Sequence, residues 1–269
     1  MEVNNKRIIV TGAASGIGKE LLVGLSDYDC TVMAVDRNAD GLAQLMATLQ
    51  YSRASIFSYD CDIGSQEKVD DLFEHAIQAM GDIDIFIANA GFAYYEELIH
   101  ADWGRMEQIF NVNVYSPIYS AIRMKLLHPH TPFKVVITAS AIGKLGLPGY
   151  ALYAATKAAI DRFAEAYRFE LSDPASLALV YPIATDTQFF QAAARHKAPT
   201  PWPSQSPQKV ARAIIRGIEK DQKSINPSLL YQIFFTLGRL LPPLFRLEQW
   251  IELKRFRNWV KEKKEKTSG

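Results

Sequence analysis

Short apolar runs alternate with longer segments of helical periodicity along most of this 269-residue chain. Short runs rich in β-branched residues are typical of strands, and those at 83–88 and 135–137 are apolar enough to be buried on both faces. Strands are predicted at 6–11, 30–35, 54–59, 83–88, 133–139 and 176–181, with a shorter candidate at 223–226. Helices are predicted near 16–27, 39–51, 65–80, 102–128, 150–171 and 206–220.

Strands that alternate with helices build right-handed βαβ units, so the pattern predicts an α/β fold with a parallel sheet. Ligands of such sheets bind at the carboxyl ends of the strands. Asp36, Asp62, Asn89 and Ser140 all fall at the carboxyl ends of predicted strands. We therefore expect these four side chains at one edge of the sheet, around a bound ligand.

A glycine-rich segment, Thr-Gly-Ala-Ala-Ser-Gly-Ile-Gly, covers residues 11–18 between the first predicted strand and the first predicted helix. Strand, glycine turn and helix in this order form the context of a dinucleotide site. The glycines let the main chain approach a pyrophosphate, and the helix N-terminus offers free N–H groups and a partial positive charge. The candidate cofactor-binding residues here are Gly12, Ser15, Gly16, Ile17 and Gly18.

Asp36 ends the second predicted strand, about 20 residues beyond the glycine turn. A carboxylate at this place accepts hydrogen bonds from the adenosine ribose hydroxyls and repels a 2′-phosphate. Arg37 has the opposite preference, because a guanidinium pairs with phosphate. Of these two opposing preferences, we give more weight to that of Asp36, so NAD is the predicted cofactor and NADP is the alternative.

Tyr153 and Lys157 lie four residues apart in a predicted helix, so their side chains share one face. A phenol normally loses its proton near pH ~10, which is too high for acid–base work at neutral pH. A cation held beside the phenol favours the phenolate and lowers that pKa. The pair is therefore a candidate proton-transfer site, with Tyr153 as the acid or base.

With these motifs in place, the chain resembles the short-chain dehydrogenase/reductase family, in its single-domain branch, from about Lys6 to about Pro227. The resemblance implies a Rossmann-like, doubly wound sheet of about seven strands in the order 3-2-1-4-5-6-7. It also implies NAD(P)-dependent interconversion of a secondary alcohol and a ketone. Further motifs of the family occur in the expected order at Asp62, Ile63, Asn89, Ala90, Gly91, Asn113 and Ser140.

The resemblance assigns the proton chemistry to a catalytic tetrad of Asn113, Ser140, Tyr153 and Lys157. Ser140 would hydrogen-bond the substrate oxygen and fix its distance from Tyr153. Lys157 would lower the pKa of Tyr153 and hold the nicotinamide ribose. Asn113 would hold a water that links Lys157 to solvent, and Asn111 is the alternative residue for this role.

Two further motifs would border the cofactor if the resemblance holds. Asp62 resembles the adenine-contacting aspartate of the family, followed by Ile63, and Asp60 is the alternative. The Asn-Ala-Gly segment at 89–91 would steady the central sheet and lie beside the cofactor.

The chain departs from the family after the sixth strand, where other members carry Pro-Gly and then a Thr that contacts the nicotinamide amide. Here Pro182 is followed by Ile183, and a β-branched residue does not readily adopt the positive φ open to glycine. Thr187 stands where the Thr is expected, and Thr185 is a second candidate. The main-chain N–H of Ile183 is a further candidate contact.

Residues 188–207 form the predicted substrate lid, which carries Phe189, Phe190 and Trp202. Apolar walls of this kind favour a lipophilic ketone or secondary alcohol as the substrate. The alternative is that these aromatics only pack the lid or a subunit contact. The facing wall is expected at Tyr94, Tyr95, Ile142, Leu147 and Pro148.

Residues 1–227 form the predicted catalytic domain, and 228–269 form a helical tail outside the family's core pattern. Pro242 and Pro243 break the tail into an apolar segment and a second helix. The tail is basic, with nine Lys or Arg against four Asp or Glu from residue 226 onward. Its apolar segment is shorter than the ~20 residues of a spanning helix. Peripheral membrane contact through 228–266, a subunit-contact arm and a lid over the site are the open alternatives.

The formal net charge of +1 gives no reason to expect nucleic acid as a partner. Two cysteines make no disulfide framework, and the N-terminal residues contain no apolar signal segment, so a cytoplasmic location is expected. The five histidines have no metal-ligand spacing, and no metal is predicted. Family resemblance implies a homodimer or homotetramer.

A non-catalytic dinucleotide-binding sensor or scaffold with the same fold is the alternative function. A degraded tetrad would favour the sensor, but Ser140, Tyr153 and Lys157 all stand in this chain. A methyltransferase with a similar glycine turn would leave Tyr153 and Lys157 without a role.

Overall fold

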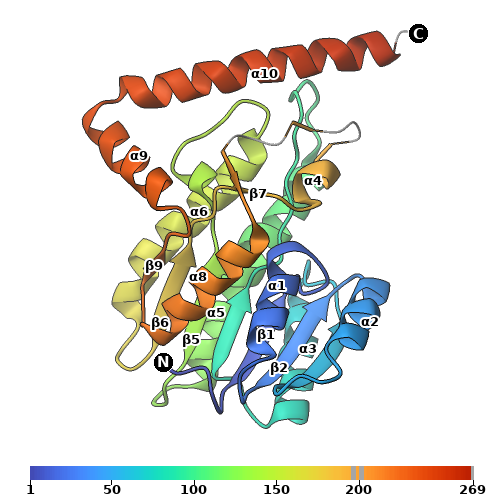
Figure 1. Ribbon diagram of the computed structural model, residues 1–269, viewed down its shortest axis with the longest axis vertical. Coiled ribbons are helices and arrows are strands. Elements are labelled where there is room, and N and C mark those ends of the chain that lie inside the picture. The colour runs from blue at the N-terminus through green and yellow to red at the C-terminus, as the bar shows by residue number, and fades with distance from the viewer. Residues whose placement is uncertain (195–197, 200–202, 268–269) are drawn as a thin grey trace.

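The computed structural model describes residues 1–194, 198–199 and 203–267 (Figure 1), so Trp202 of the predicted lid lies outside the described residues. Within these residues, seven strands form one parallel sheet in the order β3-β2-β1-β4-β5-β6-β9, which confirms the predicted strand order. The strands are β1 (Arg7–Thr11), β2 (Thr31–Asp36), β3 (Ser55–Asp60), β4 (Ile85–Ala88), β5 (Lys134–Thr138), β6 (Ser176–Val180) and β9 (Ser224–Ile225).

Helices cover both faces of the sheet. Successive side chains of a strand point to opposite faces, so Ile8 enters one apolar core and Ile9 enters the other. One core receives α1, α2 and α8, and the other receives α3, α5 and α6. The helices that flank the sheet are α1 (Gly16–Leu25), α2 (Ala39–Thr48), α3 (Gln66–Met80), α4 (Trp103–Phe110), α5 (Ser116–Leu127), α6 (Ala151–Tyr167) and α8 (Pro207–Glu219).

Several short elements connect the main strands and helices. Among the described residues, β7 and β8 pair as a separate two-stranded sheet, and 3-10 turns precede and follow α6. These elements are β7 (Ala184–Thr185), α7 (Phe189–Ala192), β8 (Ser204–Gln205), and the 3-10 turns Ala141–Gly143 and Arg168–Glu170.

The helix predicted at 102–128 is interrupted by a π-helical turn, Asn111–Tyr115, between α4 and α5. The N–H of Ser116 donates to the carbonyl of Asn111, one residue further back than in an α-helix. Pro117 has no N–H, so the main-chain carbonyl of Asn113 lacks the donor that a regular α-helix would give it. Turns of this kind are frequent at functional sites.

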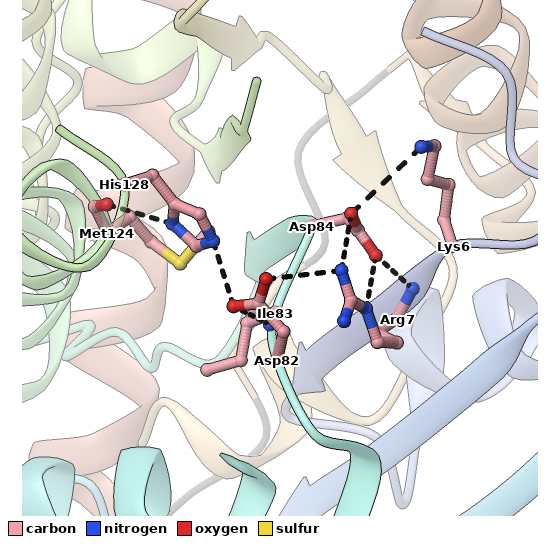
Figure 2. Close-up of polar contacts among 7 residues, drawn as sticks. All are labelled: Lys6, Arg7, Asp82, Ile83, Asp84, Met124 and His128. Carbon is pink, nitrogen blue, oxygen red and sulfur yellow. Dashed lines mark hydrogen bonds and ion pairs between the residues drawn. The ribbon is translucent and has the colours of Figure 1, made fainter. Parts of the chain in front are cut away.

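A polar cluster joins β1 to the start of β4 at the amino ends of the strands (Figure 2). The Asp84 carboxylate accepts bonds from Arg7 Nε at 2.7 Å, Arg7 Nη2 at 3.0 Å and the Arg7 N–H at 2.8 Å. Asp82 lies beside it, 3.2 Å from Arg7 Nη2 and 2.9 Å from His128 Nε2. Burial alone would raise the pKa of Asp84, but the bonds and charge of Arg7 outweigh burial and hold this pKa below its ordinary value.

We expect Asp84→Asn to lower the free energy of unfolding by about 2 kcal/mol at pH 7, because it removes charge-assisted bonds to Arg7. A carboxylate whose pKa is lower in the folded protein than in the unfolded chain stabilises the fold at pH values above its unfolded pKa of ~3.9. This stabilisation is lost as the pH falls through the pKa that the carboxylate has in the folded protein. Urea denaturation at pH 7 and pH 3 should therefore show a deficit that shrinks in acid. Asp71→Asn, at the exposed pair with Lys68, should cause no measurable change.

The tail forms two helices, α9 (Leu229–Leu240) and α10 (Pro243–Thr267), which meet at the predicted break at Pro242 (Figure 1). In Figure 1, α10 crosses the end of the molecule opposite the chain's N-terminus. Its Trp259 is buried and packs on Tyr95, with ring centroids 4.8 Å apart. None of the described helices combines the length and apolar character needed to cross a membrane.

Candidate active site

A cavity of about 350 Å³ opens along the carboxyl ends of the strands, at the edge of the sheet where a ligand was expected. Three members of the predicted tetrad, Ser140, Tyr153 and Lys157, line this cavity, whereas Asn113 and Gly18 lie behind its wall. Most predicted cofactor residues also line it: Gly12, Ser15, Gly16, Ile17, Asp36, Arg37, Asp62, Ile63, Asn89, Ala90, Gly91, Pro182, Ile183, Thr185 and Thr187.

The glycine turn has the shape of a phosphate cradle. Gly12 and Gly16 have φ of +69° and +54°, which side-chain-bearing residues rarely adopt. A Cβ on Gly18 would lie 1.9 Å from the Gly12 carbonyl oxygen, so only glycine lets the helix start this close to the strand. Ser15 makes no side-chain cap bond, and the first turn of α1 holds no acidic residue. The N–H groups at this helix end are therefore available to an anion.

The carboxylate of Asp36 is held beside this turn, where its Oδ2 accepts a bond from the Ala14 N–H at 2.9 Å. Arg37 turns toward Asp62, with Nη1 and Oδ2 3.9 Å apart, and both side chains are largely exposed. The alternative residue Asp60 ends β3 but does not line the cavity. The ribose-facing end of the cavity thus presents a fixed carboxylate and a guanidinium whose charge is shared with a second carboxylate.

Asn89 ties three strands together at the floor of the cavity. Its Nδ2 donates to the Thr11 carbonyl at 3.1 Å, and its Oδ1 accepts a bond from Thr138 Oγ1 at 3.2 Å. The Thr11 hydroxyl in turn accepts the N–H groups of Asn89 and Ala90 at 3.1 Å each. These bonds hold β1, β4 and β5 in register at the end where the site is built.

Tyr153 and Lys157 project from α6 into the inner part of the cavity, opposite the end of β5. The Ser140 hydroxyl lies close enough to the Tyr153 phenol to favour its phenolate, and both residues line the cavity. Lys157 Nζ donates to the Thr138 carbonyl at 2.7 Å and lies 5.7 Å from the centroid of the Tyr153 ring. Tyr153 is 7% exposed and Lys157 is 4% exposed, so both polar groups are shielded from water.

Burial dominates the titration of both groups. It raises the pKa of Tyr153 to about 12, although the hydrogen bond with Ser140 acts in the opposite direction. It lowers the pKa of Lys157 to about 8. The expectation of a depressed pKa at Tyr153 is therefore wrong for this structure, because loss of water disfavours the phenolate more than its neighbours favour it.

The side chain of Asn113 is fully engaged behind the cavity wall. Its Nδ2 donates to the Phe92 carbonyl at 2.8 Å and to Thr156 Oγ1 at 3.2 Å, while its Oδ1 accepts the Phe92 N–H at 3.0 Å. A Cβ on Gly91 would lie 3.0 Å from that Oδ1, so glycine lets the two segments touch. The main-chain carbonyl of Asn113, which Pro117 cannot serve, is the oxygen that remains for a water.

The segment after β6 forms its turn without glycine. Ile183 is buried at 9% exposure and is not among the described residues with positive φ, so a β-branched residue fits there. The Thr185 hydroxyl donates to the Ile183 carbonyl at 3.0 Å. A Cβ on Gly16 would lie 3.1 Å from Thr187 Cγ2, which places Thr187 directly over the glycine turn.

The apolar end of the cavity differs from the predicted wall. Phe92 and Ala93 line it together with Phe189 and Phe190 of the lid. Phe92 and Ala93 were not predicted to line the cavity, although they directly follow the Asn-Ala-Gly segment that was expected beside the cofactor. None of the five residues expected on the facing wall lines the cavity: Tyr94, Tyr95, Ile142, Leu147 and Pro148.

Contacts with the tail explain why Tyr95 is not part of the wall. Its ring is 3% exposed and packs against Tyr150, Phe256 and Trp259, with centroids 4.6, 5.6 and 4.8 Å away. Tyr150 in turn lies 6.3 Å from Tyr153. The tail helix α10 therefore joins the apolar cluster that surrounds the candidate catalytic tyrosine.

The described ranges contain no group of three or more His, Cys, Asp or Glu residues arranged to hold a metal ion. Cys30 and Cys61 are buried free thiols, and burial raises the pKa of each to about 11.

Comparison with known proteins agrees with this geometry. The family model for short chain dehydrogenases matches residues 6–198. The ketoacyl reductase HetN of Nostoc sp. is 24% identical over 275 residues, covering 97% of this chain and 96% of that protein. A short-chain dehydrogenase/reductase from Burkholderia phymatum in complex with NAD superposes with a TM-score of 0.76 at 20% identity, covering 95% of this chain and 97% of that one.

A second solved structure gives the same fold. The short-chain dehydrogenase from Sphingobium yanoikuyae in complex with NADPH has a TM-score of 0.76 at 20% identity, covering 88% of this chain and 95% of that one. The family match spans most of the chain and includes the glycine turn, Ser140, Tyr153 and Lys157. The chain therefore belongs to the short-chain dehydrogenase/reductase family, a family of oxidoreductases.

Proposed function

We propose that the protein is an NAD(P)-dependent oxidoreductase that interconverts a secondary alcohol and a ketone, with Tyr153 as the acid or base. The supporting observation is that Ser140, Tyr153 and Lys157 line one cavity, which also contains the glycine turn and Asp36. A sensor or scaffold that only binds a dinucleotide would not need a shielded proton donor at this place. Turnover of a carbonyl substrate panel with NADH and NADPH tests the proposal directly.

The cavity residues fit a dinucleotide. The free N–H groups at the start of α1 would bind the pyrophosphate, Asp36 the adenosine ribose, and Lys157 the nicotinamide ribose. Thr187, which lies over the glycine turn, would contact the nicotinamide end. When bound, the nicotinamide supplies or accepts the hydride, and the protein supplies binding, orientation and the proton.

Asp36 should make NAD the preferred cofactor, since its fixed carboxylate would repel a 2′-phosphate. We expect Asp36→Ala to raise the ratio of kcat/KM for NADPH to that for NADH about tenfold or more, because the repulsion is removed while Arg37 remains. Steady-state kinetics with both cofactors measure this ratio. A wild-type enzyme that already prefers NADPH would contradict the assignment.

The proton path follows from the pKa values of the site. With a pKa of about 12, the Tyr153 phenol carries its proton at neutral pH, which is the form that can donate to a carbonyl oxygen. The protonated phenol is therefore ready to act as the proton donor when a carbonyl is reduced near pH 7. Alcohol oxidation needs the phenolate, which nearby positive charge such as that of Lys157 favours. A water on the Asn113 carbonyl would link Lys157 to solvent and return the proton.

The substrate is proposed to be lipophilic. Phe92, Ala93, Phe189 and Phe190 give the cavity an apolar end, which suits a ketone or secondary alcohol with a hydrocarbon body. The relative HetN carries the name ketoacyl reductase, which agrees with a ketone as the reacting group.

We also propose that the protein assembles as a homodimer or homotetramer. Tyr115, Ile122 and Leu126 are 59%, 39% and 70% exposed on the π-helical turn and α5. Apolar side chains gathered on one segment are typical of a surface that a second subunit covers.

A further inference from the structure

The two tail helices expose a concentrated apolar surface. Each of its nine side chains is between 42% and 81% exposed, and they come from only 23 consecutive positions, 229–251. We call this set the docking surface. Its members are Leu229, Leu230, Ile233, Leu237, Leu240 and Leu241 from α9 and the residue after it, and Leu247, Trp250 and Ile251 from α10.

The docking surface is not a badly packed core, because the tail helices already have a packed inner face. Phe234 and Phe235 each lie 5.6 Å from the ring of Phe245, and Gly238 is buried against the same ring. Further along α10, Trp259 packs on Tyr95. On α9, the exposed leucines recur at helical spacing and so form one stripe along an outer side. This stripe remains in water while the inner side is covered.

Basic residues accompany this surface on α10. Arg246, Lys254, Arg257 and Lys261 are exposed on that helix. Lys254 Nζ lies 3.4 Å from the centroid of the Trp250 ring, which places a cation and an indole together at the edge of the apolar stripe. Basic and aromatic side chains in this arrangement suit the boundary between lipid headgroups and acyl chains.

The charge distribution favours a negatively charged partner. From residue 226 onward the chain has nine basic and four acidic residues, although the formal charge of the whole chain is only +1. Two copies that met tail to tail would bring like charges together, which opposes such a contact. An anionic lipid surface offers both the negative charge and the apolar interior that the docking surface needs.

We propose that α9 and α10 dock this protein on the surface of an anionic phospholipid bilayer. The helices would lie in the interface and not span the membrane, since no described helix can cross it. Their inner face would remain on the catalytic domain through the contact of Trp259 with Tyr95. Because this inference concerns binding alone, it does not depend on which substrate the enzyme uses.

Flotation of the full-length protein with vesicles tests the inference. We expect binding to vesicles of phosphatidylcholine and phosphatidylserine, little binding to phosphatidylcholine alone, and weaker binding as salt rises. Leu230→Ser/Leu240→Ser should bind anionic vesicles about tenfold or more weakly, because two leucines no longer enter the lipid. Tyr51→Ser is the matched control, since Tyr51 is 98% exposed but follows α2. It should bind like the wild type.

A second set of variants separates charge from apolar contact and from loss of folding. Arg246→Gln and Arg257→Gln should each weaken binding about fivefold, since a basic side chain near an anionic surface contributes that much. Thermal melts should show that all variants remain folded. Equal binding to neutral and anionic vesicles would overturn the inference. The inference would also be overturned if Leu230→Ser/Leu240→Ser bound anionic vesicles as tightly as the wild type. In that case, light scattering would test whether the variant dissociates an oligomer. Dissociation would assign the docking surface to a contact between subunits.

Discussion

Tyr153→Phe should lower kcat for carbonyl reduction about 10²- to 10⁴-fold, the range that a positioned proton donor contributes. The change removes one oxygen from the site and keeps the ring that packs against Phe189 at 5.5 Å. The glycine turn and Asp36 are untouched, so the dissociation constant for NADH should remain within about twofold of the wild type, a change of about 0.4 kcal/mol. Single-turnover rates and fluorescence titration with NADH measure the two quantities.

Tyr150→Phe is the matched control for this experiment. Tyr150 is the neighbouring buried tyrosine, and its hydroxyl has no hydrogen-bond partner among the described residues. Its removal should leave kcat close to the wild-type value. If Tyr150→Phe and Tyr153→Phe lower the rate equally, the hydroxyl of Tyr153 has no special part in the chemistry, and the proposed proton path is wrong.

Replacement of Lys157 should have the second-largest effect. Lys157→Met should lower kcat/KM about 10²-fold, because it removes a buried charge that stabilises the phenolate left after proton donation. Burial lowers the pKa of Lys157 to about 8, so its charge is present below that pH and is lost above it. Wild-type carbonyl reduction should therefore decline above about pH 8. The Met variant should be slow at every pH and should lack this decline.

Lys144→Met provides the comparison, because Lys144 also places its Nζ near a tyrosine ring, 3.7 Å from the centroid of Tyr181. Burial lowers its pKa too, but the side chain does not line the catalytic cavity. This variant should keep both the wild-type rate and the decline at alkaline pH. A wild-type profile that rises through pH 8 would show that the charge of Lys157 is not required for reduction.

Local patterns were sufficient to predict alternating strands and helices and to reveal the family resemblance, and that resemblance implied the strand order. Apolar runs, the glycine turn and the acidic residue after β2 each depend on neighbours close in sequence, and these signals agree with one another. The helix from 102 to 128 was predicted as continuous because periodicity is insensitive to one extra residue in a turn. The π-helical turn at Asn111–Tyr115 follows from Pro117, whose missing N–H was visible in the sequence.

The parts that sequence reasoning missed depend on contacts between distant segments. Tyr95 was expected to face the substrate, but its ring is buried by Trp259 and Phe256, more than 160 residues later in the chain. The pKa of Tyr153 was predicted from its helix neighbour alone, whereas burial by the surrounding apolar cluster decides its direction. Which distant segments pack on Tyr95 and Tyr153 has no signature in the residues next to them, so these two features required the structure.

The packing of Trp259 against Tyr95 also has a consequence for biosynthesis. The candidate cofactor residues begin at Gly12, whereas the indole that packs on Tyr95 belongs to residue 259. A ribosome therefore completes the nucleotide-binding half long before the chain can seal the chamber around Tyr153. The aromatic cluster that includes Tyr153 is therefore completed only after α10 has been synthesised and has packed on Tyr95.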